Sequence, residues 1–87
     1  MKLQRLGIPG LAVVEPDVFT DSRGSFFESW NRQRWAELGI MFDVVQANVS
    51  RSGHAVLRGL HYQWPNPQGK LVSVLDGEVW DVAVDIR

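Results

Sequence analysis

The dipeptide Asp76-Gly77, set between two runs of strand-forming residues, constrains the fold more than any other feature of the sequence. The runs cover residues 70–75 and 78–86. Asp-Gly is favoured in the tight turns that join antiparallel strands, because glycine adopts positive φ without steric cost. The pattern therefore predicts a β-hairpin here. The apolar face of its second strand would be formed by Trp80, Val82, Val84 and Ile86.

The N-terminal third also has strand patterns. Residues 11–19 are rich in β-branched and aromatic side chains but contain Pro16, which predicts an edge strand or two strands that meet at a bend. Residues 21–24, Asp-Ser-Arg-Gly, have the composition of a type I turn. We expect a hairpin at this turn, with residues 25–30 as the strand beyond it.

One short helix is expected after these strands. Asn31 is a favourable N-cap, and Gly39 is a favourable stop signal. Between them, Trp35 and Leu38 lie three residues apart and would share one side of the helix.

Two more strands are predicted in the centre of the chain, at residues 44–50 and 55–63. The first alternates between apolar and polar residues, and the second has strand character. Residues 64–69 contain two prolines and a glycine, and so form a connection. Many short strands and one brief helix predict an all-β sandwich or barrel, with residues 1–87 in a single domain.

The size and net charge of the chain limit the classes of partner that it can have. The chain has 87 residues and a formal net charge of -1, which argues against nucleic acid as a partner. It contains no cysteine, and a domain this small buries only about 60% of its unfolded surface. We therefore expect oligomerisation to add stability. The sequence lacks the pattern of a signal peptide or a membrane span, so the expected location is the cytoplasm.

Metal and nucleophilic chemistry are both poorly supported. A catalytic metal needs about three protein ligands, whereas the chain has only two histidines, His54 and His61. The second position of a His-x-His pair is occupied by Gln63. There is no cysteine nucleophile, no serine in a sharp glycine-bounded turn, and no phosphate-binding glycine motif. General acid/base chemistry remains.

His61 is the best candidate for a catalytic base, because imidazole side chains titrate near neutral pH. A lone histidine in a strand is more often structural, but here Arg58 and Lys70 would place cations near it. Such cations suit a phosphorylated or enolate-forming substrate. Arg58 and His61 have opposite parity in a regular strand, so we expect Gly59 to mark a bulge or twist.

Two further groups have a functional and a plain structural interpretation. Gln46 and Asn48 give one predicted strand an amide-bearing face, which could bind a polar ligand or simply face solvent. Arg23, Phe26 and Glu28 surround the first predicted turn. Without further information they are an exposed arginine, a packed phenylalanine and a solvated glutamate.

Five motifs occur in order across nearly the whole chain. They are D-S-R-G-S-F-F-E-S at 21–29, Q-A-N-V-S at 46–50, V-L-R-G-L-H-Y-Q at 56–63, Q-G-K-L-V at 68–72 and G-E-V-W-D-V-A-V-D-I-R at 77–87. Together they resemble the dTDP-4-dehydrorhamnose 3,5-epimerase family. The resemblance implies a cupin-like jelly-roll β-barrel, of which this chain would be the N-terminal portion. It also implies no metal or cofactor, and a homodimer that exchanges N-terminal strands.

The resemblance further implies epimerisation of dTDP-4-dehydro-6-deoxy-D-glucose at C3 and C5, which gives dTDP-4-dehydro-L-rhamnose for dTDP-L-rhamnose biosynthesis. His61 would remove each proton, and Lys70 would stabilise the enolate oxygen and bind substrate. The other implied substrate contacts are Gln46, Asn48 and Arg58, with Arg23, Phe26 and Glu28 reaching the nucleotide or its diphosphate across the dimer.

The sequence departs from the family in length, because family members are considerably longer. Their acid, a tyrosine, and the aspartate that orients the histidine would lie beyond Arg87; Tyr62 matches an aromatic packing position instead. Ala47 replaces a residue that is commonly acidic. We expect the sequence to be the N-terminal part of such an epimerase. The alternatives are a non-catalytic half barrel that binds sugar nucleotides and, less well supported, a metal-dependent cupin.

Overall fold

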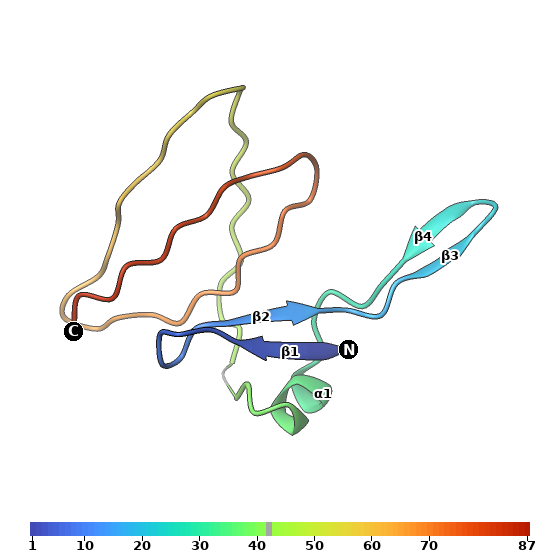
Figure 1. Cartoon of the computed structure of the whole chain (residues 1–87), viewed down its shortest axis with the longest axis horizontal. Coiled ribbons are helices and arrows are strands. Elements are labelled where there is room, and N and C mark those ends of the chain that lie inside the picture. The colour runs from blue at the N-terminus through green and yellow to red at the C-terminus, as the bar shows by residue number, and fades with distance from the viewer. Residues whose placement is uncertain (42) are drawn as a thin grey trace. The chain divides into compact units, whose positions relative to one another are not determined.

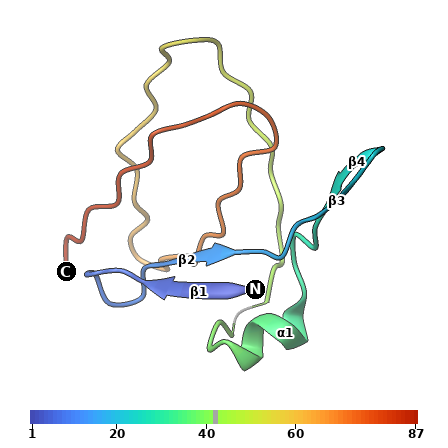
Figure 2. The same ribbon diagram turned by 45° about the vertical axis from the view of Figure 1, so that its right-hand side comes forward.

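The computed structural model describes residues 1–41 and 43–87. Its contacts divide the chain into two units, residues Met1–Asp43 with Ala83–Arg87, and residues Val44–Val82. All the regular secondary structure of the described residues belongs to the first unit (Figures 1 and 2). The elements are β1 (Lys2–Arg5), β2 (Ala12–Glu15), β3 (Phe19–Asp21), β4 (Gly24–Phe26) and α1 (Arg32–Glu37).

Strands β1 and β2 form an antiparallel pair in which Leu3 lies opposite Val14. Both of these side chains are half-buried. Within the connection, the Leu11 N–H donates to the Ile8 carbonyl at 3.0 Å, and the Leu6 N–H donates to the Leu11 carbonyl at 3.0 Å. The sequence pattern does not predict β1, because its four residues, Lys-Leu-Gln-Arg, contain a single apolar side chain.

Strands β3 and β4 form the hairpin expected around residues 21–24 (Figure 1). Asp21 lies opposite Gly24, so Ser22 and Arg23 form a two-residue connection. Gly24 has a φ of +138°, which is accessible to glycine and costly for other residues. The interruption at Pro16 is also confirmed, since β2 ends at Glu15 and β3 begins at Phe19.

The strand predicted over residues 25–30 ends early, at Phe26. Continuing the observed register beyond Phe19 and Phe26 would set Asp17 opposite Glu28 and Pro16 opposite Ser29. Like charges directly opposite one another destabilise a strand pair, and proline has no N–H to donate to the ladder. Asp17 instead forms an ion pair with the N-terminal amine of Met1 at 2.7 Å.

Helix α1 confirms the predicted helix and both of its ends. The Asn31 side chain accepts a hydrogen bond from the Arg34 N–H at 2.9 Å. At the other end Gly39 has a φ of +93°, and its N–H donates to the Ala36 carbonyl at 2.9 Å. Trp35 on this helix is 4% exposed. Its ring lies 4.9 Å from that of Trp30, at an interplanar angle of 50°.

Residues 44–87 contain no strand in this structure, so the predictions of paired strands at 44–50, 55–63, 70–75 and 78–86 are wrong here. Every residue in this part is exposed. The chain does bend at residues 75–77, where Gly77 has a φ of +91°, but no ladder forms. An alternating pattern makes a strand only when a neighbouring strand satisfies its backbone groups, and none does so here.

At the level of class, an all-β protein with one short helix agrees with the elements observed. They form two small antiparallel sheets of two strands each, with the order β1-β2 and β3-β4. Among the described residues, no helix is long and apolar enough to cross a membrane.

The Asn31 cap yields a first test. We predict that Asn31→Ala lowers the free energy of unfolding by about 1 kcal/mol, because it leaves the Arg34 N–H without its acceptor. Urea unfolding followed by tryptophan fluorescence measures this, since Trp35 is buried in the helix. Asn31→Ser keeps a capping oxygen and should stay close to the wild type. Equal stability of the alanine and serine variants would contradict the cap's role.

Candidate functional site

The predicted site residues fall in both units. Arg23, Phe26 and Glu28 belong to the first unit. The second unit contains Gln46, Asn48, Arg58, His61 and Lys70.

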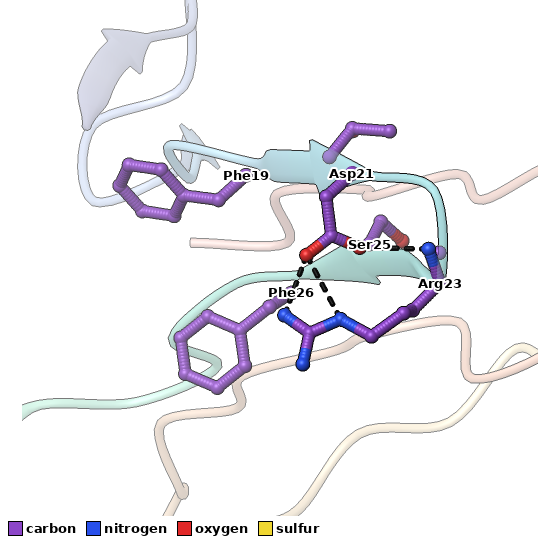
Figure 3. Close-up of a pocket in the computed structure, with 7 residues that line it drawn as sticks. Phe19, Asp21, Arg23, Ser25 and Phe26 are labelled. Carbon is purple, nitrogen blue, oxygen red and sulfur yellow. Dashed lines mark hydrogen bonds and ion pairs between the residues drawn. The ribbon is translucent and has the colours of Figure 1, made fainter.

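The β3–β4 hairpin carries an open hollow (Figure 3), and Arg23 and Phe26 both line it. Phe26 lies opposite Phe19 in the strand register, and these side chains are 70% and 65% exposed. Figure 3 shows the Arg23 side chain folding back from the turn toward the Phe26 ring. The hairpin therefore presents two apolar rings and one guanidinium on a surface open to solvent.

Arg23 is paired with Asp21 across the turn. Its Nε donates to Asp21 Oδ2 at 3.0 Å, its Nη2 contacts the same oxygen, and its backbone N–H donates to Asp21 Oδ1 at 2.8 Å. The guanidinium lowers the pKa of the Asp21 carboxyl below its usual value, with help from the backbone N–H groups of Arg23 and Gly24. Conversely, the carboxylate raises the pKa of Arg23. The pair stabilises the charged form of both side chains, and its net charge is zero.

Glu28 is bound to the N-terminal part of α1 and does not line the hollow. Its Oε2 accepts hydrogen bonds from Arg34 Nη1 at 3.0 Å and from Asn31 Nδ2 at 3.3 Å. The structure thus brings Arg23 and Phe26 together on one hairpin, while Glu28 contacts the helix that follows it.

In the second unit, Arg58 is held by the loop that precedes it. Its Nε donates to Ser52 Oγ at 2.8 Å, and its Nη2 donates to the Arg51 carbonyl at 3.2 Å. Lys70 has a comparable partner, since its Nζ donates to Gln68 Oε1 at 2.7 Å. In the described part of the chain, neither cation has a carboxylate in ion-pair distance.

His61 follows an unusual backbone conformation at Gly59, whose φ is +125°. A Cβ built on Gly59 would lie 3.9 Å from the His61 backbone nitrogen and 4.0 Å from Nδ1. Space would therefore allow a side chain at position 59, but the backbone angle favours glycine. A special conformation was expected at Gly59; a bulge was not observed, because this segment has no ladder.

The three residues predicted to act together, Arg58, His61 and Lys70, are exposed. No hydrogen bond or ion pair joins them within the described residues. Gln46 and Asn48 are exposed as well. Their shared role therefore stays a prediction. Across residues 1–41 and 43–87, no three His, Asp or Glu side chains gather closely enough to hold a metal ion.

Sequence reasoning missed the partners of these cations, Asp21, Ser52 and Gln68. Two of them lie two positions before the cation that they contact, a spacing short enough for the two side chains to meet. The same spacing recurs at Asp85 and Arg87, whose pairing lowers the pKa of Asp85 to about 2. Ser52, six positions before Arg58, carries no comparable signal.

A family model and the curated relatives of this chain all name the same family. The model of a family described as dTDP-4-dehydrorhamnose 3,5-epimerase matches residues 5–87. A protein of that name from Pseudomonas aeruginosa is 54% identical over 88 residues, which cover all of this chain and 49% of the relative.

Two further relatives with the same name show similar agreement. The protein from Methanothermobacter thermautotrophicus is 48% identical over 95% of this chain and 45% of its own length. The protein from Salmonella typhimurium is 54% identical over 95% of this chain and 46% of its own length. The chain thus spans about half the length of these curated relatives. No solved structure matches it significantly.

The Asp21–Arg23 pair yields a second test. Because the pKa of Asp21 is lowered in the folded state, the pair is fully formed above the ordinary carboxyl pKa and is lost as the pH falls through the lowered value. We predict that Arg23→Gln raises the pKa of Asp21 toward its ordinary value, measured from the carboxyl ¹³C shift during an acid titration.

Arg87→Gln is the matched control for this titration. It should raise the pKa of Asp85 from about 2 and leave that of Asp21 unchanged. If Asp21 titrated identically in the wild type and in Arg23→Gln, the pairing across the turn would be refuted.

Proposed function

The chain belongs to the dTDP-4-dehydrorhamnose 3,5-epimerase family, and from this membership we propose that the protein carrying it epimerises dTDP-4-dehydro-6-deoxy-D-glucose at C3 and C5. The product would be dTDP-4-dehydro-L-rhamnose. The observation that carries the proposal is the family match over residues 5–87, which includes every predicted site residue.

The reaction needs a catalytic base beside the C–H group at C3 or C5, and a cation beside the C4 carbonyl oxygen. His61 takes the proton from C3 or C5, and the electron pair of the broken C–H bond moves toward the C4 carbonyl to form an enolate. Lys70 stabilises the charge on that oxygen, which develops only during the reaction. An acid on the opposite face of the ring then delivers a proton to the carbon and inverts it, and His61 loses the proton that it took to solvent. No cofactor takes part in this scheme.

The partners of the two cations support these roles. Gln68 and Ser52 are uncharged acceptors, so Lys70 and Arg58 keep their positive charges while their hydrogen bonds restrict them. A cation already neutralised by a carboxylate would offer less to an enolate or a diphosphate. Arg58 binds substrate in this proposal, together with Gln46 and Asn48.

The hairpin residues bind the nucleotide in the same proposal. Phe26 offers an exposed ring on which the thymine base of the nucleotide can stack. Arg23 offers a guanidinium that is bound to Asp21 in the absence of ligand. A diphosphate would replace that carboxylate as the partner of Arg23, whereas Glu28 would meet the nucleotide beside the hairpin. We propose that these residues act across a homodimer that exchanges N-terminal strands.

The proposed fold is a cupin-like jelly-roll β-barrel. Supporting it are the alternating runs in residues 44–86, which stay exposed and unpaired here although their apolar faces suit burial in a sheet. The curated relatives are about twice as long as this chain, and in the proposed barrel these runs pair with further strands. The proposed location is the cytoplasm.

His61→Ala yields the third test. We predict that this substitution lowers the rate of solvent-deuterium incorporation into the dTDP-keto sugar by about 10²- to 10⁴-fold, the usual contribution of a general base. Affinity for dTDP should be retained, because the imidazole acts on the sugar ring. Mass spectrometry of the sugar nucleotide measures the exchange, and isothermal titration calorimetry measures the affinity.

His54→Ala is the matched control, since it removes the other histidine of the chain, and it should exchange at the wild-type rate. Undiminished exchange in His61→Ala would refute His61 as the base. Wild-type protein that binds dTDP without any exchange would instead support a non-catalytic sugar-nucleotide-binding protein.

A further inference from the structure

Ser52 is a polar residue that the proposed reaction does not use, yet it contacts one of the cations that the reaction needs. Its Oγ accepts a hydrogen bond from Arg58 Nε at 2.8 Å. The adjacent Arg51 carbonyl accepts from Arg58 Nη2 at 3.2 Å. Two neighbouring positions of one loop therefore hold two different nitrogens of the same guanidinium, which restricts its rotation as well as its position.

The hydrogen bonds leave part of the guanidinium available. Arginine has five N–H donors in a planar fork, and the two contacts engage one on Nε and one on Nη2. Within the described part of the chain, three N–H groups remain, one on Nη2 and two on Nη1, and they can donate to phosphate oxygens.

The charge of the group that accepts the arginine's hydrogen bond affects how well that arginine can bind an anion. Ser52 and the Arg51 carbonyl are uncharged, whereas Arg23 is held by the carboxylate of Asp21. A hydroxyl orients a guanidinium without cancelling its charge. A carboxylate orients it and competes with an anionic ligand. Arg58 is therefore restricted before any ligand arrives, and neither of its two acceptors offsets its charge.

We propose that Ser52 is a positioning residue, which holds the Arg58 guanidinium ready for the diphosphate of the nucleotide substrate. The inference rests on the proposed function and adds to it a residue that acts through Arg58 alone. Restricting a long side chain before binding reduces the entropy that binding must remove. Ser52 consequently strengthens nucleotide binding and has no direct part in proton transfer.

The test is the affinity of the protein for dTDP, measured by isothermal titration calorimetry. Ser52→Ala should raise the Kd roughly three- to tenfold, the effect of losing one ordinary hydrogen bond. Ser52→Thr keeps the hydroxyl and should restore an affinity near that of the wild type. Ser52→Asp should weaken binding more than Ser52→Ala, because its carboxylate would neutralise Arg58. Ser73→Ala is the matched control and should leave the Kd unchanged.

A double-mutant cycle shows whether the effect passes through Arg58. In an Arg58→Gln background, adding Ser52→Ala should cause little further loss. An unchanged Kd in Ser52→Ala, or a full additional loss in the Arg58→Gln background, would overturn this inference and leave the proposed function standing. Failure of the wild type to bind dTDP would overturn the proposed function and the inference together.

Discussion

A β-strand is stable only when a neighbouring strand satisfies its backbone N–H and C=O groups, and this requirement determines where the chain forms strands. The first 26 residues meet it locally, because β1 pairs with β2 and β3 with β4. Residues 44–82 form a unit without any ladder. Their apolar side chains, including Trp80 at 93% exposure, remain in solvent. The proposed barrel therefore requires neighbouring strands that pair with these runs.

The nature of each cation's partner links this structure to function. Arg23 is neutralised by Asp21, whereas Arg58 and Lys70 are oriented by the uncharged side chains of Ser52 and Gln68. Within the proposal, Arg23 exchanges the Asp21 carboxylate for an anionic ligand. Among the described residues, Arg58 and Lys70 have no carboxylate to release before they bind the substrate. In this proposal the protein uses both kinds of pairing: one that is released by the ligand, and one that prepares for it.

Local interactions decide how much of this could be predicted from sequence. The hairpin at residues 21–24 and helix α1, which Asn31 and Gly39 flank, were predictable, because turn and cap residues act on their immediate neighbours. The early end of β4 could not be predicted, since it depends on the strand register, which would set Asp17 and Pro16 opposite the residues that follow β4. The hairpin predicted at Asp76-Gly77 also rests on a local turn signal, yet no ladder forms there, because a turn signal and alternation do not by themselves make an isolated strand pair stable. The chemistry of imidazole indicates His61 as a base, and the family resemblance implies the role of Lys70 at the enolate oxygen. The contact between Ser52 and Arg58 is visible only in the structure.

The position of deuterium in the product tests the central claim most directly. The wild-type protein would be incubated with dTDP-4-dehydro-6-deoxy-D-glucose in D₂O, and the sugar nucleotide analysed by NMR. We predict deuterium at C3 and at C5, on either side of the ketone, with the L-rhamnose configuration at both carbons. Deuterium at neither carbon, or exchange without inversion, would contradict the assignment of this chain to a 3,5-epimerase reaction.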